Sequence, residues 1–146
     1  MSRHDKDVRR EEAAVCESAA VALRVFRKSG VEAGDKLLIY GIGLVSLFIV
    51  QWTKTAGVKS IVLVDDVEDK VELAQKMGFT MAVRQEKLAG VINAFGDVDA
   101  CIECTGTSEA LADCVSHVRV GGIVVCVGAP AVREERLDVE VLRNLI

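Results

Sequence analysis

Two glycines and one aspartate in this chain of 146 residues have the spacing of a nucleotide-binding motif. Gly41 and Gly43 follow a short apolar strand and precede an apolar segment of helical length, and Asp65 ends the next apolar strand. Glycines at such a turn let the backbone approach a pyrophosphate, which free N–H groups and the positive end of the helix then bind. An acidic side chain about 20 residues further on can accept the hydroxyl hydrogens of an adenosine ribose. The spacing therefore predicts a dinucleotide site.

Two features of this motif leave other interpretations open. Ser46 stands where the motif usually has its third glycine. The helix and the strand would have to lie slightly further apart to accommodate this serine. Asp65 could instead cap the next helix, a common structural use of aspartate. Asp66 stands beside Asp65 and no arginine is near them in the sequence, so we expect a 2'-phosphate to be repelled and NAD to be favoured over NADP.

Strands that alternate with helices must position these residues. The apolar patterns predict strands at 36–40, 60–64, 81–83, 99–103 and 123–127, and helices at 11–28, 44–56, 67–77, 86–95, 108–118 and 139–146. Such alternation predicts an α/β fold, a doubly wound parallel sheet with the strand order 3-2-1-4-5. Ligands of these sheets bind beyond the carboxyl ends of the strands where the order reverses, here between the loops at 41–43 and 105–106.

Composition and charge limit the class of protein. An apolar content of 51% in 146 residues can form one buried core, so we expect a single domain over 1–146, with 1–10 as a charged leader. A formal net charge of −4, with one Trp and one Tyr, gives nucleic acid little to bind. The charged first dozen residues and the short apolar run at 41–52 predict a soluble, cytoplasmic protein without a membrane span.

The five cysteines and two histidines offer little for metal chemistry. Cys101 and Cys104 have the spacing of a redox or zinc pair, but residues three apart in a strand point to opposite faces. We therefore expect reduced, buried thiols. His4 and His117 cannot build a His-rich metal site, and a Ser-His-Asp arrangement lacks support. The cysteines and histidines thus predict no metal site in this chain.

A series of short motifs resembles one known family. In chain order these motifs are Glu17–Leu23, Gly30-Val31, Gly34–Lys36, Gly41–Gly43, Asp65 with Lys70, Glu103–Gly106 and Gly121–Gly128. From about residue 11 to the end, the chain resembles the coenzyme-binding Rossmann domain of the zinc-dependent medium-chain dehydrogenases/reductases, closest to the sorbitol and threonine dehydrogenase branch. The family usually has proline and glycine at the positions of Leu44 and Ser46, and proline at the position of Ser18.

The resemblance implies an oxidoreductase, an NAD-dependent alcohol or polyol dehydrogenase, in which a zinc-bound secondary alcohol passes hydride to NAD. This chain would be its NAD-binding domain. The implied contacts are the backbone N–H groups of Gly43, Leu44 and Val45 at the pyrophosphate, with Gly41 in the same loop, Asp65 at the ribose, Lys70 near the adenine, Thr105 and Gly106 beside the cofactor, and Val127, Gly128 and Ala129 near the nicotinamide. The resemblance implies no catalytic residue in this chain. Zinc is expected only in the family's other domain, because Glu17 alone cannot hold the ion.

The resemblance also implies that the sixth strand of the family's sheet is missing. The fifth strand would then be an exposed apolar edge, which residues 139–146 or a second copy of the chain would cover. We interpret the chain as a truncated domain, inactive alone. The alternative is a standalone, non-catalytic nucleotide-binding or interaction module, because Rossmann-like sheets host many functions. An NADPH-using quinone reductase would need a basic residue soon after the second strand, and the sequence has none that fits.

Overall fold

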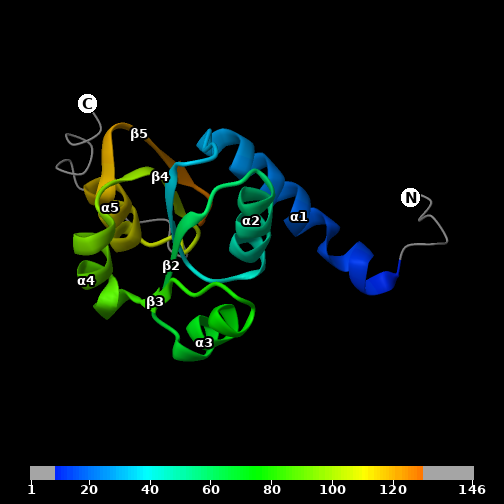
Figure 1. Ribbon diagram of the computed structural model, residues 1–146. Coiled ribbons are helices and arrows are strands. Elements are labelled where there is room, and N and C mark those ends of the chain that lie inside the picture. The colour runs from blue at the N-terminus through cyan, green and yellow to red at the C-terminus, as the bar shows by residue number, and fades with distance from the viewer. Residues whose placement is uncertain (1–8, 130–146) are drawn as a thin grey trace.

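A five-stranded parallel sheet forms the centre of residues 9–129, the part of the chain that this computed structural model describes (Figure 1). Its elements are α1 Arg10–Ser29, β1 Lys36–Tyr40, α2 Leu44–Thr55, β2 Ser60–Asp65, α3 Glu68–Lys76, β3 Ala82–Arg84, α4 Gln85–Phe95, β4 Val98–Glu103, α5 Ser108–His117 and β5 Val118–Cys126. The strand order β3-β2-β1-β4-β5, with every neighbouring pair parallel, confirms the predicted doubly wound α/β fold. The helix predicted at 139–146 lies outside the described residues.

Side chains alternate between the two faces of the sheet, and each face has its own core. On β1, Leu37 and Ile39 pack with residues of α1, α2 and α3, whereas Leu38 and Tyr40 pack with residues of α4 and α5. In Figure 1, α1 and α2 cover one face of the sheet and α4 and α5 cover the other. Because the inner strands are buried on both faces, their sequences are continuously apolar, as is usual for a parallel sheet.

The helices begin and end close to their predicted positions. Gly30 terminates α1 in the left-handed conformation, with φ 64°, as predicted. Two of the four residues predicted on the apolar face of the third helix are not buried. Val71 and Ala74 are buried, but Val67 and Met77 flank α3 and are exposed, because the chain has left the helical path at these positions. Among residues 9–129, no helix has both the length and the apolar character needed to cross a bilayer.

The last strand differs from its prediction. We expected a helix to Val118, a turn at Gly121-Gly122 and a strand from Ile123, but β5 already begins at Val118. Its pairing with β4 is irregular, since Val118 lies opposite Val98 and Ile123 lies opposite Ala100. A Cβ atom on Gly122 would lie 2.7 Å from the carbonyl oxygen of Asp99, so this irregularity requires glycine. Residues 119–122, which include both glycines, therefore form the irregular part of this pairing.

Candidate dinucleotide site

The glycine loop and Asp65 lie at the carboxyl ends of neighbouring strands. β1 and β2 pair with Tyr40 opposite Val64, and the N–H of Gly41 donates to the carbonyl oxygen of Val64 at 2.7 Å. The N–H of Ile42 donates to Asp65 Oδ2, also at 2.7 Å. The carboxylate of Asp65 is therefore fixed against the loop that would hold a pyrophosphate.

Asp65 has further partners in its own segment. Its Oδ1 accepts the N–H of Val67 at 2.9 Å, and Lys70 Nζ donates to its Oδ2 at 3.1 Å. The side chain of Asp65 is only 8% exposed, whereas that of Lys70 is 49% exposed. The residue that caps α3 is Val67, so Asp65 is not the N-cap of that helix. Both groups that the sequence predicted for the adenosine half of the site are thus together.

The first turn of α2 has N–H groups directed at the same edge. α2 begins after Gly43, and the N–H groups of Leu44 and Val45 have no acceptor among residues 9–129, as is normal for the start of a helix. The positive end of the helix dipole is at this point. Two of the three N–H groups predicted to bind a pyrophosphate are therefore open.

The third N–H group, that of Gly43, is occupied. Ser46 is buried, and its hydroxyl accepts the N–H of Gly43 at 2.7 Å while donating to the carbonyl oxygen of Gly43 at 2.9 Å. The serine that replaces the usual third glycine therefore caps α2 internally. The sequence indicated the substitution but not the direction of the hydroxyl.

The loop after β4 lies directly against the glycine loop. The N–H of Cys104 donates to the carbonyl oxygen of Tyr40 at 2.8 Å. Gly41 has a positive φ of 91°, and a Cβ atom at this position would lie 2.9 Å from the methyl carbon of Thr105. Only glycine combines this conformation with this close approach. The predicted meeting of the two loops at the point where the strand order reverses is thus present.

A pocket of about 390 Å³ opens between these elements, within the size range of small-molecule sites. It is lined by Gly41, Ile42, Gly43, Asp65, Asp66, Val67, Lys70, Gln85, Cys104 and Thr105. Gln85 and Cys104 were not predicted, although each follows directly on a strand that ends at this edge. Burial, and then the charge of Glu103, raise the pKa of the Cys104 thiol to about 12. The pocket wall therefore carries a neutral thiol at neutral pH.

The remaining predicted residues lie beyond Thr105, at the ends of β4 and β5. A Cβ atom added to Gly106 would overlap the backbone of Ala129, and one added to Gly128 would overlap the backbone of Gly106. The segments 105–106 and 127–129 are therefore in direct backbone contact. Both segments are held by the buried Glu103. We did not predict Glu103 as a site residue, because it appeared only as part of a sequence motif.

Comparison with known proteins gives the family. A family model described as zinc-binding dehydrogenase matches residues 43–145, which is more than half of the chain. The chain belongs to this family. It is 32% identical over 135 residues to sorbitol dehydrogenase of Bacillus subtilis, a match that covers 88% of this chain and 38% of that enzyme.

Solved structures of other proteins have the same fold as this chain. A Sinorhizobium meliloti protein assigned as a zinc-binding dehydrogenase, bound to NADP, has a TM-score of 0.76 and 29% identity over 90% of this chain and 41% of that one. An Escherichia coli structure described as a short chain alcohol dehydrogenase complexed with NADH has a TM-score of 0.81 at 20% identity, over 99% of this chain and 44% of that one. The chain thus spans about two fifths of the length of these proteins.

The zinc that the family name implies does not fit the described residues. Among residues 9–129, no three His, Cys, Asp or Glu side chains gather closely enough to hold a metal ion. Glu17 lies exposed on α1. Cys101 and Cys104 point to opposite faces as predicted, since Cys101 packs with α4 and α5 and has its Sγ 2.6 Å from that of Cys114, whereas Cys104 packs on the other core.

From the sequence of this zinc-binding dehydrogenase chain, we did not identify one cationic neighbour of Asp65. No arginine is near Asp65 in the sequence, but Arg84 on β3 is the register partner of Asp65. Its Nη1 atom lies 3.5 Å from Glu68 Oε2, and its Nε atom is buried without a partner among the described residues. Sequence distance concealed this neighbour, because β2 and β3 become adjacent only in the sheet.

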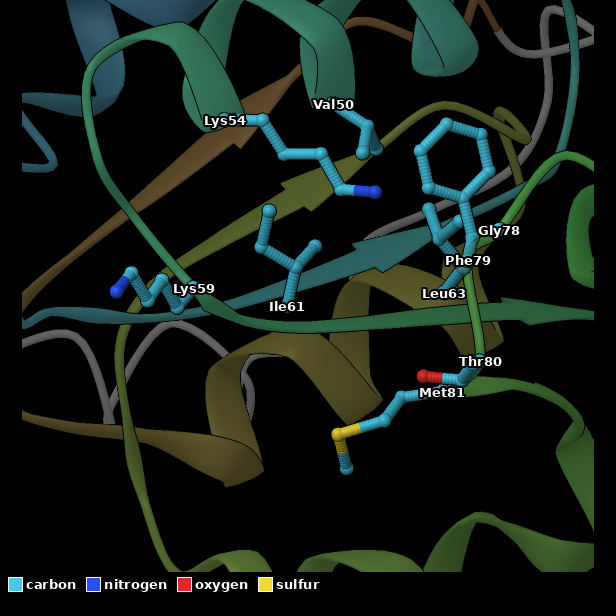
Figure 2. Close-up of a pocket in the computed structure, with 9 residues that line it drawn as sticks. All are labelled: Val50, Lys54, Lys59, Ile61, Leu63, Gly78, Phe79, Thr80 and Met81. Carbon is cyan, nitrogen blue, oxygen red and sulfur yellow. The ribbon is translucent and has the colours of Figure 1, made fainter.

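A second hollow of about 160 Å³ lies over β2 and is separate from the dinucleotide pocket (Figure 2). Its lining includes Ile61 and Leu63 of β2, and Figure 2 shows Lys54 extending from α2 toward Phe79. The ammonium group of Lys54 lies 4.1 Å from the centroid of the Phe79 ring, a cation–π contact. None of the predicted cofactor residues lines this hollow.

Proposed function

We propose that this chain binds NAD as the coenzyme-binding domain of a zinc-dependent alcohol or polyol dehydrogenase. The observation that supports the proposal best is the shared pocket of Asp65, the glycine loop and the open first turn of α2. A pyrophosphate would accept the N–H groups of Leu44 and Val45 at the positive end of α2. The nicotinamide half would then extend past Thr105 and Gly106 toward residues 127–129.

The carboxylate of Asp65 retains capacity for a ribose hydroxyl. Two ionised oxygens offer about four acceptor sites. Ile42 and Lys70 use Oδ2, and Val67 uses Oδ1, so three donors are already bound. Because Lys70 is half exposed, its ammonium can also turn from Asp65 toward the adenosine. The ribose diol would thus meet a carboxylate that is already oriented.

The charges near the ribose favour NAD over NADP. Asp65 and Asp66 both line the pocket, where a 2'-phosphate would be repelled. Arg84 does not line the pocket, and its guanidinium faces Glu68. Lys70 is the one cationic side chain in the lining. The pocket therefore suits a neutral ribose better than a phosphorylated one.

In the whole enzyme the reaction would be hydride transfer between a secondary alcohol and NAD. The cofactor supplies the hydride chemistry when it is bound, and this domain supplies binding and orientation. The zinc would be held outside residues 9–129, since these residues contain no set of ligands for it. A polyol or another secondary alcohol as substrate follows from the likeness to sorbitol dehydrogenase.

A titration of the purified chain with NADH, NADPH and S-adenosylmethionine tests the proposal. NADH should bind most tightly, and Asp65→Ala should weaken it by about tenfold or more, as expected for a lost hydrogen bond to a charged group. Asp69→Ala is the matched control, because Asp69 is an exposed aspartate outside the pocket. Binding of none of the three ligands would instead favour a non-catalytic interaction module.

Self-association through β5 belongs to the same proposal. β5 ends the sheet of the described residues, and on it Val120 is fully exposed and Ile123 is 43% exposed. An exposed apolar edge strand is a place where chains pair. A dimer that Val120→Lys dissociates in sedimentation velocity would support pairing at this edge, and a concentration-independent monomer would exclude it.

A further inference from the structure

Glu103 is a buried charged side chain at the end of β4, and its hydrogen bonds are made with the loop that borders the cofactor pocket. It is only 2% exposed. Its Oε1 accepts the N–H and the hydroxyl of Thr105, the latter at 2.5 Å, and the N–H of Gly106 at 2.8 Å. All three donors belong to two consecutive residues, so the carboxyl group fixes the conformation of this loop.

The backbone of the same residue holds the segment that follows β5. The carbonyl oxygen of Glu103 accepts the N–H of Val127 at 2.8 Å and that of Gly128 at 3.1 Å. A Cβ atom on Gly128 would lie 2.7 Å from Glu103 Oε2, so the carboxyl group also packs against this segment. Glu103 is therefore the common anchor of both segments assigned to the nicotinamide half of the cofactor.

The hydrogen bonds that begin at Glu103 extend to the start of the next helix, α5. Thr105 Oγ1, which Glu103 holds, accepts the N–H of Thr107 at 3.2 Å. Thr107 is the N-cap of α5, and its hydroxyl accepts the N–H of Ala110 at 3.3 Å. A buried carboxyl group is costly unless its hydrogen bonds are satisfied, so it is an unusual choice where an apolar side chain could simply fill space. The carboxyl group of Glu103 therefore serves to hold the loop at 105–106 in one conformation.

The adenosine half of the site is held by other groups. Among the described residues, the hydrogen bonds of Asp65 are to Ile42, Val67 and Lys70, and none of them involves Glu103. The cap of α2 by Ser46 is likewise independent of Glu103. A change at Glu103 should therefore disturb the loop at 105–106 while leaving in place the hydrogen bonds that hold Asp65 and the first turn of α2.

We propose that Glu103 is a positioning residue for the nicotinamide half of the dinucleotide, acting through Thr105, Gly106 and the backbone of 127–128. This inference rests on the proposed binding of NAD. We expect loss of Glu103 to weaken binding of the whole dinucleotide but not of ADP-ribose, which lacks the nicotinamide. General destabilisation of the fold would instead weaken the binding of both ligands.

The test is a calorimetric titration of the chain with NADH and with ADP-ribose. For Glu103→Gln, which keeps the size of the side chain, NADH should bind about tenfold more weakly, since hydrogen bonds to a charged acceptor become neutral ones. ADP-ribose should bind within about twofold of its original affinity, the scatter expected for an independent site. Glu109→Gln, an exposed glutamate in the first turn of α5, is the control and should change neither affinity.

A second variant links the effect to the loop. Thr105→Val removes the hydroxyl that donates a hydrogen bond to Glu103. The double variant Glu103→Gln/Thr105→Val should bind NADH no more weakly than Glu103→Gln alone, because the two groups act as one unit. If Glu103→Gln does not fold, Thr105→Val alone should show the same division between NADH and ADP-ribose. Equal weakening of both ligands, no weakening of NADH, or additive losses would overturn the inference. Failure of the unaltered chain to bind either ligand would refute the proposed function itself.

Discussion

The carboxylate of Asp65 accepts the backbone N–H of Ile42 at 2.7 Å, which joins the tip of β2 to the loop that follows β1. Asp65 thus has a structural and a proposed functional use at once. The side chain orients the glycine loop, and the same bond fixes the carboxylate where a ribose would meet it. A substitution at Asp65 should therefore be followed at the loop as well as at the cofactor.

Asp65→Asn should loosen the glycine loop even without cofactor. The amide keeps the shape of the side chain but replaces a charge-assisted hydrogen bond with a neutral one, a loss of about 1 kcal/mol. We expect the Ile42 amide to exchange its hydrogen about fivefold faster by NMR, as that energy implies. The Gly41 amide, which donates to Val64, should be unaffected. Unchanged protection of Ile42 would mean that Asp65 does not hold the loop.

Ser46→Ala should strengthen the binding of NADH. The substitution frees the N–H of Gly43, which Ser46 now occupies, for the pyrophosphate. One additional hydrogen bond to a charged group predicts an affinity about tenfold higher or more. The helix loses a cap, so the thermal midpoint should fall, in keeping with a cost of about 0.5–2 kcal/mol. Fluorescence titration with NADH measures the affinity, and calorimetry measures the midpoint.

Ser116→Ala is the matched control for Ser46→Ala. The hydroxyl of Ser116 also bonds to a helical carbonyl group, that of Asp113, but it lies on α5 outside the pocket. This variant should leave the NADH affinity unchanged. Equal or weaker binding of NADH to Ser46→Ala would show that the serine does not compete with the pyrophosphate.

Local sequence patterns predicted the fold of this chain better than the contacts of individual side chains. Apolar periodicity predicted the elements and the strand order, and the glycine spacing predicted the edge at which the pocket lies. The register that brings Arg84 beside Asp65 is a tertiary relationship, which depends on β2 and β3 becoming neighbours. The hydroxyl of Ser46 and the carboxyl group of Glu103 bond to residues only two or three positions away, but their directions depend on side-chain rotamers and loop conformation, which apolar periodicity does not encode.

Cys104 should react slowly with alkylating reagents although it lines the pocket. Burial and the neighbouring Glu103 raise the pKa of its thiol to about 12, and only the thiolate reacts. At pH 8 the thiolate fraction would be about one in ten thousand. Cys16 and Cys126 are exposed, contrary to the expectation of buried thiols, so iodoacetamide should modify them before Cys104. Peptide mass spectrometry over a time course follows each site, and the double variant Cys16→Ser/Cys126→Ser should lack the fast phase. Modification of Cys104 as fast as that of Cys16 would contradict its burial.

Tyr40 should limit stability at alkaline pH. It is the sole tyrosine, it is buried, and its hydroxyl donates to Asp113 Oδ2 at 3.1 Å. Burial, and then the charge and hydrogen bond of Asp113, raise the pKa of Tyr40 far above its ordinary value of 10.0. Because the pKa is higher in the folded state, the stabilisation is complete below about pH 10 and is lost as the pH rises further and the unfolded phenol ionises.

Tyr40→Phe separates this effect from other alkaline titrations. At pH 8 the variant should be less stable by about 1 kcal/mol, because a buried hydrogen bond is lost. Above pH 10 its free energy of unfolding should fall less steeply than that of the unaltered chain, so the two curves approach each other. Urea unfolding across pH 8 to about 11 gives these slopes, and absorbance at 295 nm follows the single tyrosinate. A tyrosinate signal with a midpoint near pH 10 in a chain that remains folded by circular dichroism would contradict the burial of Tyr40 beside Asp113.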